Sequence, residues 1–496
     1  MAPATIQELT KLLADDTKVQ VCAVDADGVL RGKIMAKDKF LSAAVDGFGF
    51  CSVVMGWDMH DQAYAKELKI SNLANGYRDL IARIDLDTYR RTPTTPSLPF
   101  FLVTFIEPTT NETLCACPRG LLQRINDQIE AEGYSAYAGA EVGHPSSSAV
   151  ANLLGSSATV SCIDLNPCQY EYFQFRETPV SVAAKDFKNL EPLTSGMHGY
   201  SMLRPELNSE YFHDIWDNCA KFGIPIEGPG VFESALAYQP ALRMADNATL
   251  FKWVAKTTGL KYGIMPTFMA KPYADQPGCS GHVHISLRDK SGKNVFAVEE
   301  SELKDGRADA KFEDTKRISK TAEHFLAGVL LGLPDIMPLL VPTVNGYKRL
   351  VESFWAPTRV MYAYENRIAS VRIISPPLAS PSATRLEIRV PGADMNPHLT
   401  FSAILALGLH GIREKLELRI PPIDTSKGGA ASIQSFARLP SSLASATENM
   451  KATDSMARKV LGDDFVDHFA GTRENETDLF NATVTDWELK RYFELA

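Results

Sequence analysis

Two histidines separated by one residue lie in the segment GCSGHVHISL, where an apolar and β-prone run predicts a strand. Side chains of a strand alternate between its two faces, so His282 and His284 are predicted to share one face. Val283 and Ile285 are then predicted to pack on the opposite face. An imidazole can bind a metal ion or donate to a phosphate oxygen, but two histidines on an ordinary exposed strand are an equally simple interpretation. The motif therefore needs partners elsewhere in the chain.

A glutamate flanked by arginines occurs in the phrase RLEIR, residues 385–389. The same alternation places Arg385, Glu387 and Arg389 on one face of a strand. One interpretation is a structural ladder of ion pairs, and the other is a metal-binding glutamate beside arginines that hold an anionic substrate. Three more arginines stand in short phrases of their own: Arg349, Arg367 and Arg372. Together with the histidines, these residue types suit a phosphoryl-transfer site that uses Mg²⁺ or Mn²⁺.

The overall composition restricts the class of protein. The chain has 496 residues and a net charge of -9, which argues against general binding to nucleic acids or to anionic membranes. No apolar run approaches the length of a membrane span, and the start MAPATIQELTKLLADD differs from a signal peptide. The 8 cysteines form no paired framework, so reduced thiols and a cytoplasmic location are expected. An anionic substrate must then meet a local cluster of arginines.

The length and the pattern of apolar residues predict two domains, a small one at 1–112 and a large one at 113–496. In the small domain we expect a helix at 5–14, two strands joined by a turn within 19–35, and a buried strand at 98–107. In the large domain the expected helices are 118–133, 209–223, 248–259 and 316–332, and the expected strands are 369–374 and 385–390. The C-terminal third is predicted to be mostly helical. These elements would have to bring the histidine and arginine phrases to one site.

A series of phrases along the chain stands in a recognisable order: DADGVLRGK, GYRDLIARIDLDT, GAE with YEYF, GPGVFE, TFMAKP, SGHVHISL, PTVNGYKRL, ENRIASVR and RLEIRVPGADMNP. These phrases resemble the glutamine synthetase family, and the wording is most similar to its fungal type-I-like and γ-glutamyl-amine ligase branch. The resemblance implies an α+β fold, with a small β-grasp N-terminal domain and a large catalytic domain whose curved antiparallel sheet is flanked by helices. It also implies a ring-shaped homo-oligomer with sites between neighbouring subunits.

The resemblance implies a carbon–nitrogen ligase of nitrogen metabolism, with glutamine biosynthesis as one form of the activity. The family uses ATP to phosphorylate the γ-carboxylate of glutamate, after which ammonia or an amine displaces phosphate. In this family the metal beside the transferred phosphate is bound by residues that match Glu141, His282 and Glu387. Glu171 and Glu233 match ligands of a second metal near glutamate. Both ions are implied to be Mg²⁺ or Mn²⁺.

The substrate contacts are implied in the same way. Gly278 and Arg349 match contacts to glutamate, and Arg389 matches an arginine over the transferred γ-phosphate. Contacts to the phosphates of ATP are matched by three residues: His284, Arg367 and Arg372. Asp79 matches the aspartate of the N-terminal domain that reaches into the neighbouring subunit's site and helps to deprotonate the incoming nitrogen.

Residues 142–169 interrupt a family phrase in which two glutamates lie two positions apart on one strand. Removing this anomalous insertion joins Glu141 to Tyr170 and Glu171 and restores the phrase. Val142 has a codon that begins with GT, and Gln169 can have the codon CAG, which are the dinucleotide and trinucleotide expected at the two ends of an intron. We therefore predict a retained intron. A genuine loop that leaves and re-enters the strand is the alternative.

Two further departures concern the second metal and the nitrogen acceptor. Fungal relatives carry an additional metal-binding glutamate between IEG and PGVFE, but this chain runs IPIEGPGVFE directly, with Glu227 as the nearest substitute. Trp355 stands where ammonia-using members carry a glutamate, and its ring face can attract an alkylammonium group. A tryptophan that only packs is the alternative. The sequence thus predicts a glutamate–ammonia or glutamate–amine ligase, or else a silent member that serves as an assembly or regulatory subunit.

Overall fold

The computed structural model describes residues 5–94, 96–141, 167–194, 196, 201, 203–229, 233–352, 356–424 and 433–496. At residues 140–141, 167–170, 227–229 and 233 it describes the backbone only. Trp355 and residues 142–166 of the anomalous insertion lie outside the described residues. None of the described helices is long and apolar enough to cross a membrane.

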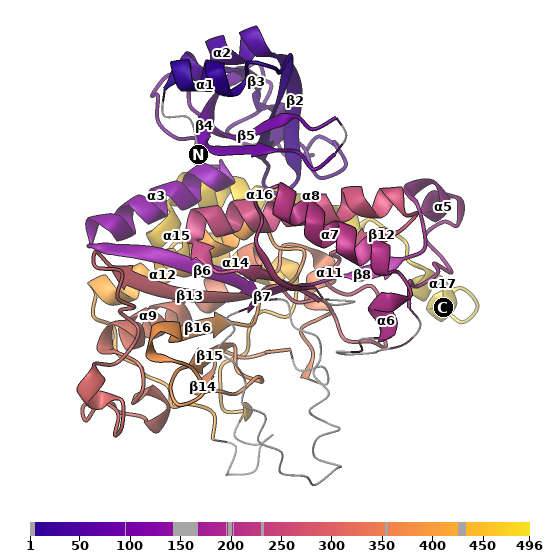
Figure 1. Cartoon of the computed structure of the whole chain (residues 1–496). Coiled ribbons are helices and arrows are strands. Elements are labelled where there is room, and N and C mark those ends of the chain that lie inside the picture. The colour runs from indigo at the N-terminus through magenta and orange to yellow at the C-terminus, as the bar shows by residue number, and fades with distance from the viewer. Residues whose placement is uncertain are drawn as a thin grey trace.

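A five-stranded sheet with the order β2-β1-β5-β4-β3 forms the N-terminal part of the molecule (Figure 1). Its strands are β1 (Lys18–Val24), β2 (Leu30–Ala36), β3 (Phe48–Cys51), β4 (Asp79–Arg91) and β5 (Pro99–Ile106). The neighbours β1 and β5 are parallel, and the other pairs are antiparallel. Helices α1 (Ile6–Leu12) and α2 (Lys37–Asp46) pack on the sheet, because Leu9 and Phe40 share a buried cluster with Val21 and Phe101. This arrangement agrees with the small strand-rich domain expected from the sequence.

The turn between β1 and β2 attaches this sheet to the rest of the chain. The Asp25 carboxylate accepts hydrogen bonds from the backbone N–H groups of Asp27 (3.0 Å) and Val29 (2.8 Å). Gly28 has a φ of +80°, a conformation that residues with a Cβ rarely adopt. The Asn396 side chain donates to the carbonyl oxygen of Asp25 at 2.9 Å. The predicted turn is confirmed, and it is also a contact to the loop that follows β16.

A six-stranded sheet with the order β11-β6-β13-β16-β15-β14 lies in the larger part of the molecule. Its strands are β6 (Tyr134–Glu141), β11 (Gln239–Pro240), β13 (His282–Asp289), β14 (Tyr362–Tyr364), β15 (Val371–Ile374) and β16 (Arg385–Ile388). All neighbours in it are antiparallel except the edge pair β14 and β15. Two smaller sheets are formed by β7 (Pro167–Glu171), β10 (Glu233–Ala237) and β9 (Ile226–Pro229), and by β8 (Phe173–Phe175) and β12 (Met265–Thr267). A curved sheet with covering helices confirms the predicted α+β fold.

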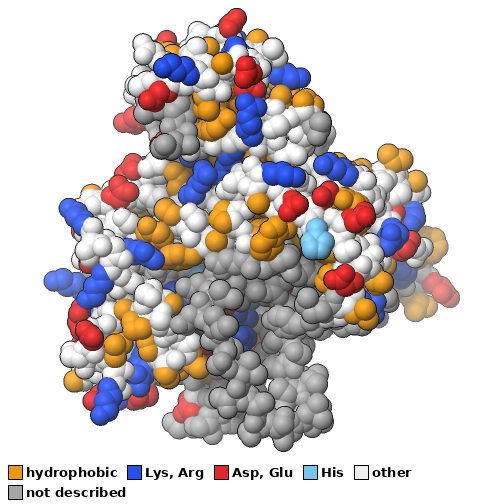
Figure 2. Space-filling view, in the orientation of Figure 1, with side chains coloured by type: hydrophobic (Ala, Val, Ile, Leu, Met, Phe, Trp, Pro, Cys, Tyr) orange, Lys and Arg blue, Asp and Glu red, His pale blue; other side chains and the backbone are white. Residues whose placement is uncertain are grey.

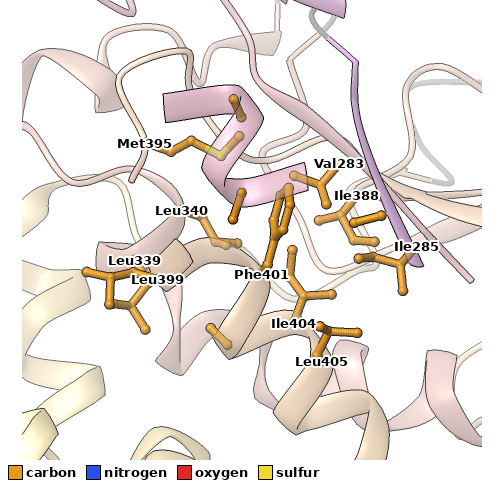
Figure 3. Close-up of a cluster of buried hydrophobic side chains, with 14 of the residues drawn as sticks. Val283, Ile285, Leu339, Leu340, Ile388, Met395, Leu399, Phe401, Ile404 and Leu405 are labelled. Atoms are coloured by element: carbon orange, nitrogen blue, oxygen red, sulfur yellow. The ribbon is translucent and has the colours of Figure 1, made fainter. Parts of the chain in front are cut away.

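One face of the six-stranded sheet is apolar and is covered by α12 (Pro397–Arg413). Val283, Ile285 and Ile388 lie in one cluster with Phe401 and Leu405 (Figure 3). Burying a side chain of this size stabilises the folded state by about 1.5–3 kcal/mol. Because the valine and isoleucines occupy this face, the residues that alternate with them on β13 and β16 must project from the other face.

The remaining helices complete the larger part of the molecule (Figure 1). They are α3 (Pro118–Ala131), α5 (Pro179–Ala184), α6 (Leu203–Glu206), α7 (Ser209–Lys221), α8 (Ala241–Lys261), α9 (Lys320–Gly332), α10 (Met337–Leu340), α11 (Val344–Tyr347), α14 (Leu443–Lys451), α15 (Met456–Leu461), α16 (Asp463–Asn481) and α17 (Asp486–Tyr492). In the described part of the C-terminal third, helices form more of the regular structure than the strands β14, β15 and β16, which agrees in part with the prediction of a mostly helical segment. The domain boundary at residues 112–113 stays a prediction.

An ionic network joins the N-terminal sheet to three helices of the larger part of the molecule. Arg119 of α3 donates to Asp85 of β4 at 2.6 Å and to Asp246 of α8 at 3.0 Å. The Nε2 atom of His398 on α12 lies 2.9 Å from the same Asp246 carboxylate. Burial would raise the pKa of Asp246, but the charge of Arg119 and the bond to His398 hold this pKa well below its usual range. The N-terminal sheet is therefore joined to the helices of the larger part by an ionised carboxylate.

Three of the differences from the sequence-based prediction concern β4, α8 and α9. Strand β4 is not predicted, because its buried residues beyond Ile84 are the polar Thr88 and Arg90 and its register against β5 shifts between Asp85 and Arg90. Helix α8 begins at Ala241, well before the predicted 248, and its buried Asp246 finds its partners on distant elements. Helix α9 begins at Lys320 rather than at 316, because the Ser319 hydroxyl caps its first turn.

Candidate active site

The histidine pair stands at the start of β13, on the face of the sheet opposite the α12 core. Only 5% of His282 and 3% of His284 is exposed. Burial lowers the pKa of His282 well below its ordinary value, and the positive charge of Arg389 lowers it further. His282 is therefore neutral, which is the form of imidazole that binds metal ions. The predicted sharing of one face by the two histidines is confirmed.

Glu387 lies on β16 opposite His284 and sits between two arginines. One carboxylate oxygen accepts a hydrogen bond from Arg372 Nη1 at 2.9 Å, and the other accepts from Arg389 and lies 3.5 Å from His282 Nδ1. Burial alone would raise the pKa of Glu387, but the charges of Arg389 and Arg372 hold it well below its usual range. Of the ladder of ion pairs considered from the sequence, the pair of Glu387 with Arg389 is present, and Arg372 of the neighbouring strand is the second arginine at this carboxylate. The same carboxylate lies beside a neutral imidazole.

The orientation of His284 is fixed by Arg385. The Nε–H group of Arg385 donates to His284 Nδ1 over 2.9 Å. Because Nδ1 accepts this bond, the proton of a neutral imidazole must be on Nε2. His284 therefore offers an N–H donor to an acceptor such as a phosphate oxygen.

Arg372 extends from β15 and lies between Glu387 and Glu365, a residue that the sequence analysis does not select. One Glu365 oxygen accepts from both Nε of Arg372, at 3.1 Å, and Nη2. The side chain of Arg367 is exposed, whereas its carbonyl oxygen accepts from Arg389 Nε at 3.0 Å. The phrase ENR, which places Glu365 two positions before Arg367, is the signal that could have identified this acid.

Gly278 and Arg349 are brought together beside the histidine strand. A Cβ atom on Gly278 would overlap the carbonyl oxygen of Ala270 and the side chain of Arg349, so glycine is required for the close approach. Arg349 is buried and donates to the carbonyl oxygens of Val390 and Pro391, the latter at 2.9 Å. Arg349 is thereby fixed against the loop that follows β16.

The strand pairings arrange the glutamates predicted to bind metals. Glu141 lies opposite His282 in the pairing of β6 with β13, and Glu171 lies opposite Glu233 in the pairing of β7 with β10. The Glu171 carboxylate accepts from the backbone N–H of Ser280 and from its hydroxyl at 2.9 Å. Burial raises the pKa of Glu171 to about 7. The strand pairings thus place Glu141 beside His282 and Glu171 beside Glu233, as each predicted metal site requires.

Other predicted site residues are placed differently. Asp79 is exposed on β4 opposite Cys51, in the sheet at the top of Figure 1, away from β13 and β16. Trp355 lies outside the described residues, as do the side chains of Glu141 and Glu233. Among the side chains that are described, no group of three His, Cys, Asp or Glu residues is gathered closely enough to hold a metal ion.

Comparison with known sequences gives consistent matches over nearly the whole chain. The family described as glutamine synthetase, catalytic domain, matches residues 115–492. The chain is 39% identical to type-1 glutamine synthetase 2 of Dictyostelium discoideum over 96% of this chain and 84% of that protein. It is 31% identical to glutamate–isopropylamine ligase of a Pseudomonas species over 96% and 95%. It is 29% identical to a γ-glutamylethanolamide synthetase of Streptomyces coelicolor over 99% and 96%.

Comparison with solved structures supports the fold. A structure of GmaS with ADP superposes with a TM-score of 0.73 and 21% identity, and covers 98% of this chain and 99% of that one. GmaS without ligand gives the same TM-score.

Proposed function

Because the chain belongs to the glutamine synthetase family, we propose that it uses ATP to join the γ-carboxylate of glutamate to an amine or to ammonia. In the first step the γ-carboxylate attacks the γ-phosphorus of ATP, which yields γ-glutamyl phosphate and ADP. In the second step the nitrogen attacks the acyl carbon, loses a proton and expels phosphate. Two of the matched relatives are glutamate–amine ligases, which favours an amine as the acceptor.

The observation that carries this proposal is the position of Glu387 between Arg372 and Arg389, 3.5 Å from His282. An ionised carboxylate and a neutral imidazole are suitable donors for Mg²⁺ or Mn²⁺. His282 and Glu387, with Glu141 opposite His282, would hold one ion. Bound ions of this kind neutralise phosphate charge and polarise the phosphoryl group.

The nucleotide side of the proposed site consists of one neutral donor and several cations. His284 would donate through Nε2–H to a phosphate oxygen, in the orientation that Arg385 fixes. Arg372 and Arg367 would neutralise the phosphate charge of ATP. Arg389 Nη1 lies 3.5 Å from His282 Nδ1, and Arg389 would stabilise the charge of the phosphoryl group during transfer.

The glutamate side is proposed to begin at Gly278 and Arg349. A Cβ on Gly278 would overlap Ala270 and the Arg349 side chain, so this glycine allows Arg349 to lie close to the histidine strand, where it supplies a positive charge for a carboxylate. Glu171 and Glu233, which are paired in register, would hold the second metal ion. Binding here orients the γ-carboxylate toward the phosphoryl group of ATP.

The acceptor side is proposed from two residues outside this cluster. Trp355 would shelter the alkyl part of an amine, and Asp79 would help to remove its proton. Asp79 lies in the N-terminal sheet, so its participation requires a second copy of the chain. We therefore propose a ring-shaped homo-oligomer in which Asp79 serves the site of its neighbour.

A second proposal is that the chain is catalytically impaired and acts as an assembly or regulatory subunit. The observation in its favour is that the sequence runs from Glu227 to Glu233 as EGPGVFE, without the additional glutamate that fungal relatives carry between IEG and PGVFE. Losing a carboxylate there would weaken the second metal and the binding of glutamate. Residues 142–169 add to this by separating Glu141 from Glu171.

Phosphate release from ATP distinguishes the two proposals. The purified full chain is supplied with Mg²⁺, ATP and glutamate, and then with ammonium, ethanolamine, putrescine or spermidine as the acceptor. Glutamate-dependent release that one acceptor stimulates is expected for a ligase, and mass spectrometry of the product identifies the amide. Absence of release with every acceptor, together with retained ADP binding, would favour the silent subunit.

A further inference from the structure

The Glu365 side chain binds the guanidinium group of Arg372. One of its oxygens faces the edge of the guanidinium formed by Nε, at 3.1 Å, and Nη2. Both side chains are largely buried, with 14% of Glu365 and 10% of Arg372 exposed. A carboxylate that meets two N–H groups of one guanidinium restrains its direction as well as its position.

The backbone of Glu365 points to the same role. Its φ is +49°, in the left-handed region that residues with a long side chain rarely adopt. Its N–H group donates to the carbonyl oxygen of Ile373 at 3.0 Å, which extends the β14–β15 pairing past Tyr364. Unfavourable backbone conformations of this kind persist where the surrounding structure requires a side chain at one place, and they concentrate at functional sites.

Glu365 supplies an anchor that Glu387 alone does not. Glu387 is shared between Arg372 and Arg389, and it is also the carboxylate beside His282. If Glu387 turns toward a cation, Arg372 keeps its second anion because Glu365 belongs to a different strand connection. Arg372 is therefore held from two sides by carboxylates with different duties.

We propose that Glu365 is a positioning residue that fixes the guanidinium of Arg372 for binding the phosphates of a nucleotide. This inference rests on the proposed function, because it takes Arg372 to be a nucleotide contact. A free arginine side chain loses rotational freedom when it binds a ligand, whereas one that is already fixed loses less. Glu365 thus improves nucleotide affinity without touching the nucleotide.

The variants for the test separate the side chain from the backbone. Glu365→Asn keeps a residue that tolerates the left-handed conformation but is too short to reach Arg372. Glu365→Gln keeps an oxygen acceptor and removes the charge. Glu132→Gln is the matched control, because Glu132 pairs with Arg413 at 2.8 Å on the surface. Thermal unfolding of each full-length variant shows whether the fold is retained.

The measurement is ADP binding to the full chain in the presence of Mg²⁺ by titration calorimetry. Glu365→Asn is expected to weaken binding about tenfold, the effect of losing one charge-assisted hydrogen bond. Glu365→Gln is expected to lose less, and Glu132→Gln to match the unaltered chain. In an Arg372→Ala background Glu365→Asn is expected to change affinity by less than about twofold, because the two residues act as one unit.

Three results would contradict the proposed role of Glu365, and they can be told apart. Equal weakening by Glu365→Asn in both backgrounds would mean that Glu365 acts on the ligand directly. Unchanged affinity in the folded Glu365→Asn variant would mean that Arg372 needs no positioning. Absence of ADP binding to the unaltered chain would contradict the proposed nucleotide site itself.

Discussion

Glu171 accepts hydrogen bonds from both the backbone N–H and the hydroxyl of Ser280. Ser280 lies two residues before His282, and His282 is paired with Glu141. In an antiparallel pair, the position two residues after Glu141 would lie opposite Ser280. Glu171 therefore contacts Ser280, as a residue two positions after Glu141 would. It does so although residues 142–169 lie between Glu141 and Glu171 in the sequence.

A variant that joins Glu141 directly to Tyr170 is accordingly expected to fold and to be more active. Removing residues 142–169 would join β6 to the Tyr170–Glu171 end of β7 as one continuous strand, with both glutamates on the same face. We expect glutamate-dependent phosphate release to rise at least about tenfold, the size of effect that ordering the ligands of a metal site produces. Steady-state assays of the two purified chains make the comparison.

A third chain controls for the loss of the segment itself. Replacing residues 142–169 with a glycine–serine linker of equal length removes the sequence but keeps the interruption, and should leave activity low. Sequencing of mature transcripts tests the retained intron directly. Uniform presence of the corresponding nucleotides would contradict the intron hypothesis, even if the shortened chain proved active.

The sequence was sufficient to predict which face of the sheet bears the polar site residues. It was not sufficient to predict the contacts that fix the orientation of those residues. Alternation along a strand is local, so the positions of His282 and Glu387 follow from the residue types around them. The bond from Arg385 to His284 and the clamp of Glu365 on Arg372 depend on how different strands are paired, which spacing along the chain does not reveal. Asp246 is a further example, because its partners Arg119 and His398 are distant in sequence.

The Asp246 network predicts a large loss of stability on substitution. Asp246→Asn would leave Arg119 buried with Asp85 as its remaining anion, and would weaken the bond to His398. Breaking a buried ionic network from one side typically costs about 3–5 kcal/mol of unfolding free energy. Urea unfolding at neutral pH, followed by circular dichroism, measures this change.

An exposed ion pair provides the control for the Asp246 variant. Glu132 and Arg413 lie 2.8 Å apart, with 41% and 42% of their side chains exposed. Glu132→Gln is expected to change the free energy of unfolding by less than about 1 kcal/mol, because water screens such pairs. Similar effects of the two substitutions would show that the Arg119 network does not stabilise the fold as described.

The choice of nitrogen acceptor is expected to depend on Trp355. Trp355→Glu would replace an aromatic face, which attracts alkylammonium groups, with a carboxylate that can accept a proton from ammonium. The ratio of kcat/KM for ammonium to kcat/KM for the preferred amine is expected to rise at least about tenfold. Trp355→Phe keeps an aromatic face and should preserve the original preference. An unchanged ratio in an active Trp355→Glu enzyme would indicate that Trp355 only packs.

The stability of the protein is expected to fall in mild acid because of His468. This residue of α16 is buried, and neither ring nitrogen has a hydrogen-bond partner among the described residues. Burial lowers its pKa to about 4, whereas an unfolded chain has a histidine pKa of about 6.5. Between these values the unfolded state binds more protons, so the free energy of unfolding decreases as the pH falls.

The contribution of His468 can be isolated by substitution. The difference of pKa corresponds to about 3 kcal/mol, present above pH 6.5 and lost progressively toward pH 4. His468→Leu removes the titrating group and leaves an apolar side chain in an apolar place, so urea unfolding should show a shallower decline of stability between pH 7 and pH 5. His213→Gln, at an exposed position of α7, should keep the original slope.

The decline of stability should persist in part in His468→Leu, because burial also lowers the pKa of His282 and His398. An identical slope in His468→Leu and the unaltered chain would mean that His468 is already protonated or hydrated in the folded state.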